Sequence, residues 1–276
     1  MRTMLLGSVE FLTKCNERSC KLEHIQSIEK AFALLERFSH RKKEYSVTEL
    51  SQDLGLPRPT VSRIIGTLVG LGYLKQNSET KRYALGLKFL PLASIVQESF
   101  VLRDIATPVL HRLRDLLGET VYINVRDGYD RVCIESFQGL EQVRTFVQIG
   151  QRSPLHMGAD SLMLLASLSD EELDEYLKNV KLIPYTENTI VNPDVLVAKI
   201  REAKEKEYTY SKGEYHPGSA CLSAPVKDRA GIIVASIAVS FPTSRAVPRY
   251  VDQYRSSIIN AAKEISTLNG YEHQVE

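Results

Sequence analysis

The chain has 276 residues, and 43% of them are apolar, which is enough material for two packed domains and excludes a disordered or fibrous protein. The net charge is only +1, but residues 1–90 carry 15 lysines and arginines against 9 acids, whereas the remainder carries 20 against 25. A basic first part and an acidic second part favour a polyanion as partner of the first, although chance also produces such an imbalance between domains.

The cysteines and the apolar runs indicate a cytoplasmic protein. Cys15, Cys20, Cys133 and Cys221 form no C-x-x-C pair, so we expect reduced thiols and no metal. No run approaches the roughly 20 apolar residues of a membrane span, and "MLLG" near the start is too short for a signal-peptide core. Residues 1–22 show no periodicity and are expected to form a flexible extension.

Residues 23–86 have the pattern of three helices followed by a hairpin. Ser46 and Glu49 form a capping box that starts the second helix, and Gly55 follows its end. Pro59 fits the first turn of the third helix, because its missing N–H would be unpaired there anyway. "YLK" and "RYAL", on either side of a polar turn, predict the hairpin. The first helix is predicted from apolar residues at helical spacing, namely Ile25, Ile28, Phe32, Leu35 and Phe38, with Leu34 widening the stripe.

This order of elements is that of a winged helix-turn-helix. The third helix places Ile64, Ile65 and Leu68 inward and leaves polar residues outside, where arginine suits guanine edges and hydroxyl groups suit phosphate or bases. Solvated faces, or a winged helix that binds only protein, are the alternatives. The predicted DNA contacts are Arg58, Thr60, Ser62, Arg63 and Thr67 on the helix, and Lys75, Lys81 and Arg82 on the wing.

Residues 87–100 are predicted to form a linker helix. Leu87, Leu90, Ile95 and Val96 are more apolar than a free linker needs. Either a partner chain or the second domain of the same chain therefore covers them, and the sequence leaves both alternatives open.

Residues 101–276 change to a period of two and are predicted to form an α+β domain with a mostly antiparallel sheet. Helices are expected near 159–179, 194–207 and 248–269. The strand candidates are "TVYINV", "RVCIESF", "VRTFVQIG", "CLSAPV" and "GIIVASIAVS".

The chain resembles the IclR family of bacterial transcription regulators. The resemblance rests on "TELSQDLGLPRPTVSRIIGTLVGLGYL" and "RYALGLKFLPLA" in the first half, and on "GETVYINVRDG", "SPLHMGADSLMLLA" and "GSACLSAPVKDRAGIIVASIAVSFPTSR" in the second. It implies a winged-helix DNA reader, a linker helix and a GAF-like domain that binds a small organic effector. It also implies homodimers joined through the DNA-binding halves, often paired into homotetramers.

The resemblance places an effector site in the second domain. Members commonly carry a Gly-Lys pair where this chain has Ser161-Leu162, and an acidic residue near the position of Ser211, so the ligand of a relative does not transfer. A helix start near Ala159 would offer N–H groups to a carboxylate, but Asp160 and Glu214 would oppose it, which favours a weakly charged ligand. Small residues in the late strands either leave room for that ligand or allow close packing. The implied effector residues are Met157, Gly158, Ala159, Asp160, Tyr210, Ser211, Glu214, Cys221, Ser223, Ala238 and Ser240.

The resulting prediction is a ligand-responsive, sequence-specific DNA-binding regulator that acts on an inverted-repeat operator, without cofactor or catalytic residues. One alternative is an enzyme that uses Cys221 as a thiol nucleophile beside His156, with His216 and Glu214 nearby. A metal site of His156, His216 and Cys221 is a further alternative, but these residues do not have the close sequence spacing that is typical of metal ligands.

Overall fold

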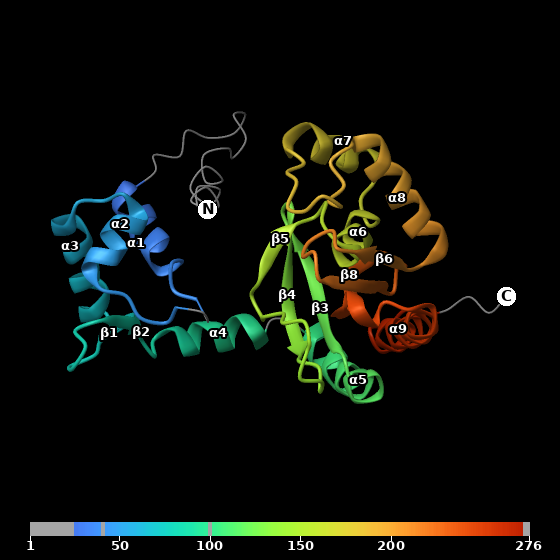
Figure 1. The fold of residues 1–276 in the computed structure, drawn as a ribbon, viewed down its shortest axis with the longest axis horizontal. Coiled ribbons are helices and arrows are strands. Elements are labelled where there is room, and N and C mark those ends of the chain that lie inside the picture. Colours follow the sequence, from blue (N-terminus) through green and yellow to red (C-terminus); the bar gives the residue numbers. More distant parts are fainter. Residues whose placement is uncertain (1–24, 40–41, 99–100, 273–276) are drawn as a thin grey trace. The chain divides into compact units, whose positions relative to one another are not determined.

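The computed structural model describes residues 25–39, 42–98 and 101–272, which belong to two compact units, Met1–Ile95 and Val96–Glu276 (Figure 1). The division falls inside the predicted linker. The predicted extension at residues 1–22, with Cys15 and Cys20, lies outside the described residues.

Ahead of the linker, the described residues of the first unit form three helices and a two-stranded hairpin, as predicted for a winged helix-turn-helix. Ser46 accepts a hydrogen bond from the Glu49 amide, and the Glu49 carboxylate accepts one from the Ser46 amide, so the predicted capping box is confirmed. Gly55 ends that helix with a φ of 64°. The elements are α1 (Gln26–Leu35), α2 (Val47–Leu54), α3 (Arg58–Gly70), β1 (Leu74–Gln76) and β2 (Tyr83–Leu85).

Helix α1 forms where its periodicity predicts, but most of its apolar stripe does not enter the core. Leu34 is fully buried against α2 and α3, whereas Ile25, Ile28 and Phe32 are 60%, 51% and 60% exposed. A periodicity of 3.6 predicts a helix and an apolar face, but it does not say which molecule covers that face.

The linker helix α4 (Phe89–Glu98) begins directly after the wing. Gly86 makes that junction, because a Cβ atom there would lie 2.1 Å from the Gly72 carbonyl oxygen. The Gly86 amide donates to the Tyr73 carbonyl oxygen at 2.8 Å, and the Phe89 ring packs on the Tyr73 ring. The apolar residues predicted on this helix are exposed, including Leu90 at 65% and Ile95 at 64%.

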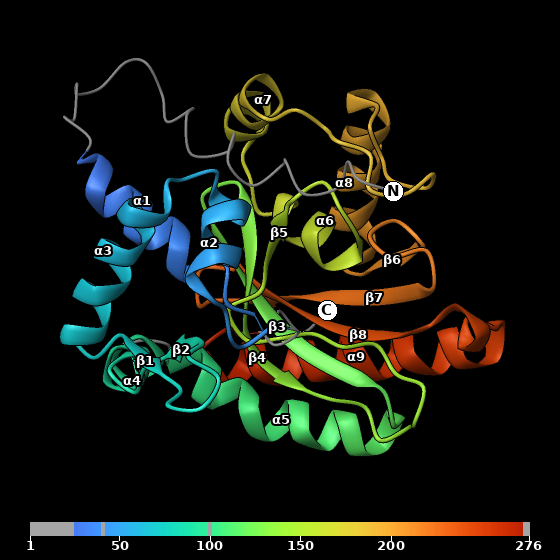
Figure 2. The ribbon, with the colours of Figure 1, turned by 60° about the vertical axis from the view of Figure 1, so that its left-hand side comes forward.

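The second unit is a six-stranded antiparallel sheet in the order β5-β4-β3-β8-β7-β6. Helices α5 and α9 cover one face, and α6, α7 and α8 lie over the other (Figure 2). The predicted α+β class with a mostly antiparallel sheet is therefore confirmed. The elements are α5 (Val101–Leu117), β3 (Thr120–Asp127), β4 (Asp130–Phe137), β5 (Arg152–Pro154), α6 (Ala159–Leu165), α7 (Asp170–Asn179), α8 (Pro193–Lys206), β6 (Thr209–Lys212), β7 (Ser219–Lys227), β8 (Ile233–Pro242), the 3-10 helix η2 (Thr243–Arg245) and α9 (Pro248–Leu268).

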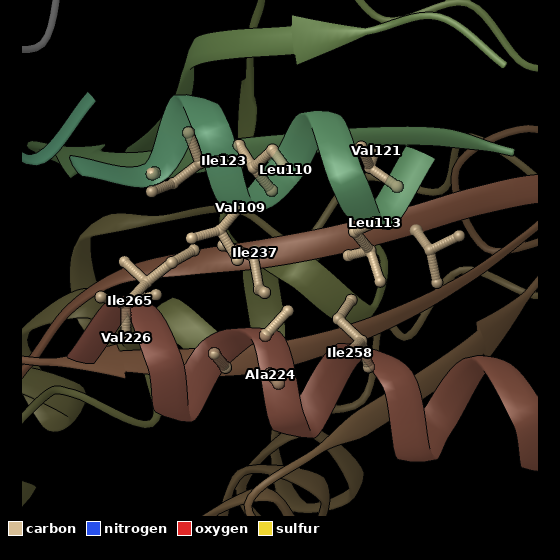
Figure 3. Close-up of a cluster of buried hydrophobic side chains, with 14 of the residues drawn as sticks. Val109, Leu110, Leu113, Val121, Ile123, Ala224, Val226, Ile237, Ile258 and Ile265 are labelled. Carbon is tan, nitrogen blue, oxygen red and sulfur yellow. The ribbon is translucent and has the colours of Figure 1, made fainter. Parts of the chain in front are cut away.

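The main core of this unit lies between the sheet and the pair α5 and α9. Leu110 of α5 and Ile258 and Ile265 of α9 point toward Ile123 and Ile237 of the central strands (Figure 3). These side chains are fully buried, so this face is closed to ligands and acts as the rigid base on which the opposite face is built.

Two predicted segments differ in the structure. "VRTFVQIG" was expected to be a strand, but residues 143–150 are irregular, because side chains rather than a strand ladder satisfy their backbone. Thr120 Oγ1 donates to the Thr145 carbonyl oxygen at 2.7 Å, and Gln138 Nε2 donates to that of Val147 at 2.6 Å. Conversely, Tyr210 and Ser211, which were not among the strand candidates, lie in β6, which gains its ladder from β7.

Candidate DNA interface and effector site

Helix α3 presents a polar face beside its buried one. Val61, Ile65 and Leu68 are buried, as the predicted inner face requires, although Ile64 is only partly covered. On the other side, Arg58, Ser62, Arg63 and Thr67 are exposed, while Thr60 is half-buried. The structure therefore brings four of the five predicted helix contacts to one accessible surface.

The wing divides its three predicted cations into two kinds. Lys75 and Lys81 are exposed. Arg82 is half-buried, with Nη2 at 2.6 Å from Glu49 Oε2 and at 3.4 Å from the Glu44 carbonyl oxygen. Its guanidinium is thus already engaged within the domain, unlike the exposed ammonium groups of Lys75 and Lys81.

The sheet gathers most of the predicted effector residues on the face that α6 covers. Register places Ser211 opposite Cys221 and Cys221 opposite Ser240, so these three side chains form one row across β6, β7 and β8. Ser223 and Ala238 are opposite one another in the next row. Side chains directly opposite on antiparallel strands are neighbours, so residues far apart in sequence meet here.

Tyr210 is not part of this group. It is opposite Leu222, whose side chain belongs to the core beneath α5 and α9, and it is 38% exposed. Successive residues of a strand point to opposite faces, so Tyr210 and Ser211 cannot share the site. Tyr210 was predicted as an effector residue, but strand β6 points its side chain to the face opposite that of Ser211.

The turn before α6 is held by hydrogen bonds within the chain. The Ala159 amide donates to Ser211 Oγ at 3.0 Å, and Gly158 adopts a φ of 85°. The expected free N–H at this helix start is thus occupied. Met157, Ala159 and Asp160 are all buried, so the turn forms the floor of the cluster rather than an open cradle.

Asp160 is neutralised by a buried cation that the sequence analysis did not single out. Arg131 Nη1 lies 2.9 Å from Asp160 Oδ2, and Asn124 Nδ2 donates to the same oxygen at 3.0 Å. Both partners are buried strand residues. Arg131 stands at the start of a strand candidate that also contains Glu135 and Ser136, so no local pattern singles it out, although a charge buried in a packed sheet requires a counter-ion.

Glu214 is the second acid of the cluster, and the charge of Lys199 acts on it. Its Oε2 is buried and receives no hydrogen bond from the described residues. Burial raises the pKa of this carboxyl group to about 7, against the opposing effect of a backbone hydrogen bond from Gly158. Near neutral pH, Glu214 can therefore accept or donate a hydrogen bond.

The side chains proposed for an enzyme are engaged elsewhere. The Cys221 thiol lies 3.5 Å from the Tyr122 hydroxyl, and burial raises its pKa well above the usual range, which disfavours the thiolate. His156 contacts the Ile183 carbonyl oxygen at 3.2 Å and the Tyr176 hydroxyl at 3.5 Å. Within the described ranges, no three His, Cys, Asp or Glu residues are grouped as a metal site.

A hollow of about 280 Å³ lies in another part of the second unit, where the end of α8 approaches β7 and β8. Lys204, Lys227 and Ile233 line it, and none of the predicted effector residues does. Of the helices in the described residues, none has the length and apolarity to cross a membrane.

Comparisons with known proteins agree with both units. Residues 27–78 match the IclR helix-turn-helix domain, and residues 95–267 match the model described as bacterial transcriptional regulator IclR C-terminal. The HTH-type transcriptional regulator KdgR of Escherichia coli (strain K12) is 30% identical over 90% of this chain and 94% of its own length. The transcriptional repressor IclR of the same strain is 30% identical over 89% of this chain and 90% of its own length.

Solved structures share the fold. The crystal structure of Thermotoga maritima IclR is 29% identical, covers 90% of this chain and 100% of its own, and has a TM-score of 0.74. An IclR homologue from Microbacterium hydrocarbonoxydans, complexed with 4-hydroxybenzoate, is 21% identical, with a TM-score of 0.75 over 88% of this chain and 98% of its own. With both domain models matched in order along nearly the whole chain, the protein belongs to the IclR family of bacterial transcriptional regulators.

Proposed function

We propose that this regulator recognises an inverted-repeat DNA operator as a homodimer and responds to a weakly charged organic effector, which it binds without converting. The observation that carries the DNA assignment is the exposed polar face of α3. Arginines such as Arg58 and Arg63 hydrogen-bond guanine edges in the major groove, and Ser62 and Thr67 suit bases or phosphate. Because DNA is the target, we infer that the protein works in the cytoplasm.

The test of this assignment is the pair of variants Arg58→Ala and Arg63→Ala. Each should lose about 1–3 kcal/mol of binding to a duplex selected by the wild type from a random library, with an unchanged unfolding midpoint. The matched control is Arg201→Ala, which removes an exposed arginine of α8 in the second unit. Affinities within twofold of wild type for both variants would refute the assignment.

The effector site that we propose is the cluster around the turn before α6. Arg131 neutralises Asp160, and Ser211 occupies the Ala159 amide, so a carboxylate finds fewer donors at that turn. Glu214 Oε2 is left without a hydrogen-bond partner among the described residues, which favours a ligand that offers a hydroxyl or amine donor. Although a relative of this fold was solved with 4-hydroxybenzoate, this arrangement favours a ligand with less negative charge.

Calorimetry of the full-length chain against neutral polyols, amines and aromatic acids would test the site. At least one neutral or amine ligand should bind, and Ser240→Leu, which places a bulky side chain in the row with Cys221, should abolish its binding. Undiminished binding by that variant would place the site elsewhere, and consumption of the ligand over time would restore the enzyme alternative.

A further inference from the structure

One carboxylate, that of Glu49, joins the wing to the helix-turn-helix. Within the described residues it accepts hydrogen bonds from the Ser46 amide at 2.8 Å and the Ser46 hydroxyl at 2.9 Å. It also receives Arg82 Nη2 at 2.6 Å and Lys42 Nζ at 3.1 Å. The same group therefore caps α2, binds Arg82 directly before strand β2 and binds the segment that precedes α2.

The backbone at this point is also joined. Tyr45 and Tyr83 exchange two backbone hydrogen bonds, of 3.0 and 2.7 Å, so the segment before α2 adds a short third strand to the wing. The hairpin β1–β2 itself has only three paired positions, and so short a hairpin is marginal without further support. Arg82 lies next to this bridge and fixes the side of the wing that faces α2.

We propose that Glu49 is a positioning residue for DNA binding and that Arg82 acts through it. The pair sets the angle between the wing and α2, against which the recognition helix α3 packs. With that angle fixed, the exposed ammonium groups of Lys75 and Lys81 reach the DNA backbone while α3 lies in the major groove. Arg82 then contributes to affinity without touching phosphate.

Simple electrostatics makes the opposite prediction for Glu49. An acid close to a DNA-binding surface repels phosphate, so its removal should tighten binding to every sequence. If Glu49 positions the wing, its removal should weaken binding instead. The two accounts therefore predict opposite changes in DNA affinity. Weaker binding after removal of Glu49 cannot be explained by electrostatic repulsion alone.

The experiment uses the full-length chain with Glu49→Gln, Arg82→Gln and the double variant. Glutamine at the third helical position still completes a capping box, so Glu49→Gln removes the charge and keeps the cap. The control is Glu79→Gln, which removes an exposed acid from the turn of the wing, outside the network. The DNA probes are the duplex selected by the wild type and a random-sequence duplex.

We expect both single variants and the double variant to weaken binding to both duplexes by about the same factor, roughly fivefold or more, because residues that act as a unit are not additive. The dependence on salt should flatten equally in all three. The control should bind as tightly as wild type or more tightly. Unchanged or tighter binding by Glu49→Gln would overturn the proposal, as would a double variant whose loss is the product of the two single losses.

Loss of folding is distinguished by circular dichroism and by Arg82→Gln, which leaves the cap of α2 untouched. If Glu49→Gln unfolds while folded Arg82→Gln binds like wild type, the proposal also fails. If Arg82→Gln alone flattens the salt dependence, Arg82 is a direct phosphate contact and Glu49 is not its positioning partner.

Discussion

Lys81 adopts a φ of 55° at the turn of the wing, a left-handed conformation that side chains other than those of glycine and asparagine rarely take. Its amide donates to the Asn77 carbonyl oxygen at 3.0 Å, and its own carbonyl oxygen accepts from Gln76 Nε2. The turn thus holds an exposed ammonium in a conformation that costs stability, which suggests that the side chain is kept for binding.

Lys81→Asn should therefore move stability and DNA binding in opposite directions. Asparagine tolerates the left-handed conformation, so the variant should gain about 0.5–1 kcal/mol in free energy of unfolding. Loss of the cation should weaken DNA binding on all sequences and lower the salt slope by about one. Lys75→Asn, in strand β1, is the control: it should weaken binding without the gain in stability. Denaturant titrations and fluorescence anisotropy measure both, and a destabilised Lys81→Asn would contradict the strain argument.

Glu214 makes stability depend on pH. Its pKa is raised to about 7 in the folded protein, above that of the unfolded chain, so between these two values the folded state holds a proton that the unfolded state releases. The stability that the neutral carboxyl group contributes is fully present below about pH 4.5 and is lost as the pH rises to about 7. For a half-buried group, the loss in free energy of unfolding is at most about 3 kcal/mol. Urea midpoints of wild type and Glu214→Gln should diverge across that window, because the variant lacks this component. Parallel curves would refute it.

At the scale of elements, a bulge in β4 shifts the alternation of its side chains between the two faces of the sheet. Ile123 is opposite Glu135 and Asn124 is opposite Cys133, which leaves Ile134 as the extra residue. Cys133 therefore faces the effector cluster, whereas Glu135 forms an ion pair of 2.7 Å with Arg103 of α5. A strict period of two, as used for the sequence, would have placed both on one face.

Two glycine substitutions in the first unit, one of them at the junction between wing and linker, should change its stability in opposite directions. Gly86→Ala should destabilise the first unit by about 1–3 kcal/mol or more, because its Cβ would meet the Gly72 carbonyl oxygen. Gly66→Ala, in the exposed middle of α3 with nothing within 4 Å, should stabilise the same unit by up to about 1 kcal/mol. Thermal unfolding of the two variants provides the comparison, and equal shifts would show that the close approach carries no cost.

At the scale of the whole molecule, exposed apolar surface on α1 and α4 argues for a second copy of the chain. Ile28, Phe32, Leu90 and Ile95 are each at least half exposed, and folded proteins rarely leave so many large apolar side chains in water unless another surface covers them. One winged helix also contacts few base pairs, so a two-fold partner would double the recognised site.

Phe32→Glu and Leu90→Glu should therefore convert a homodimer to monomers at micromolar concentration and weaken binding to an inverted repeat. Ile232→Glu, which alters an exposed apolar residue on the hairpin between β7 and β8, is the control and should leave the dimer intact. Light scattering that shows a wild-type monomer with specific DNA binding would exclude the dimer.

The sequence alone determined the elements whose causes are local. The capping box of α2, the proline at the start of α3 and the apolar periodicities act over a few residues, so the winged helix-turn-helix and the α+β sheet could be predicted from them. The polar face of α3 followed for the same reason, since helix geometry fixes which residues share a face.

Tertiary structure decided what depends on distant partners. The pairing of Arg82 with Glu49 and of Arg131 with Asp160 joins residues on different elements, and no local pattern specifies either. Strand β6 exists because β7 offers it a ladder, which turned Tyr210 away from the cluster, while residues 143–150 had alternation but no partner strand. A buried charge or an unpaired strand edge costs free energy only once water has been excluded. The need for a counter-ion or a partner strand therefore arises only when the whole chain is packed.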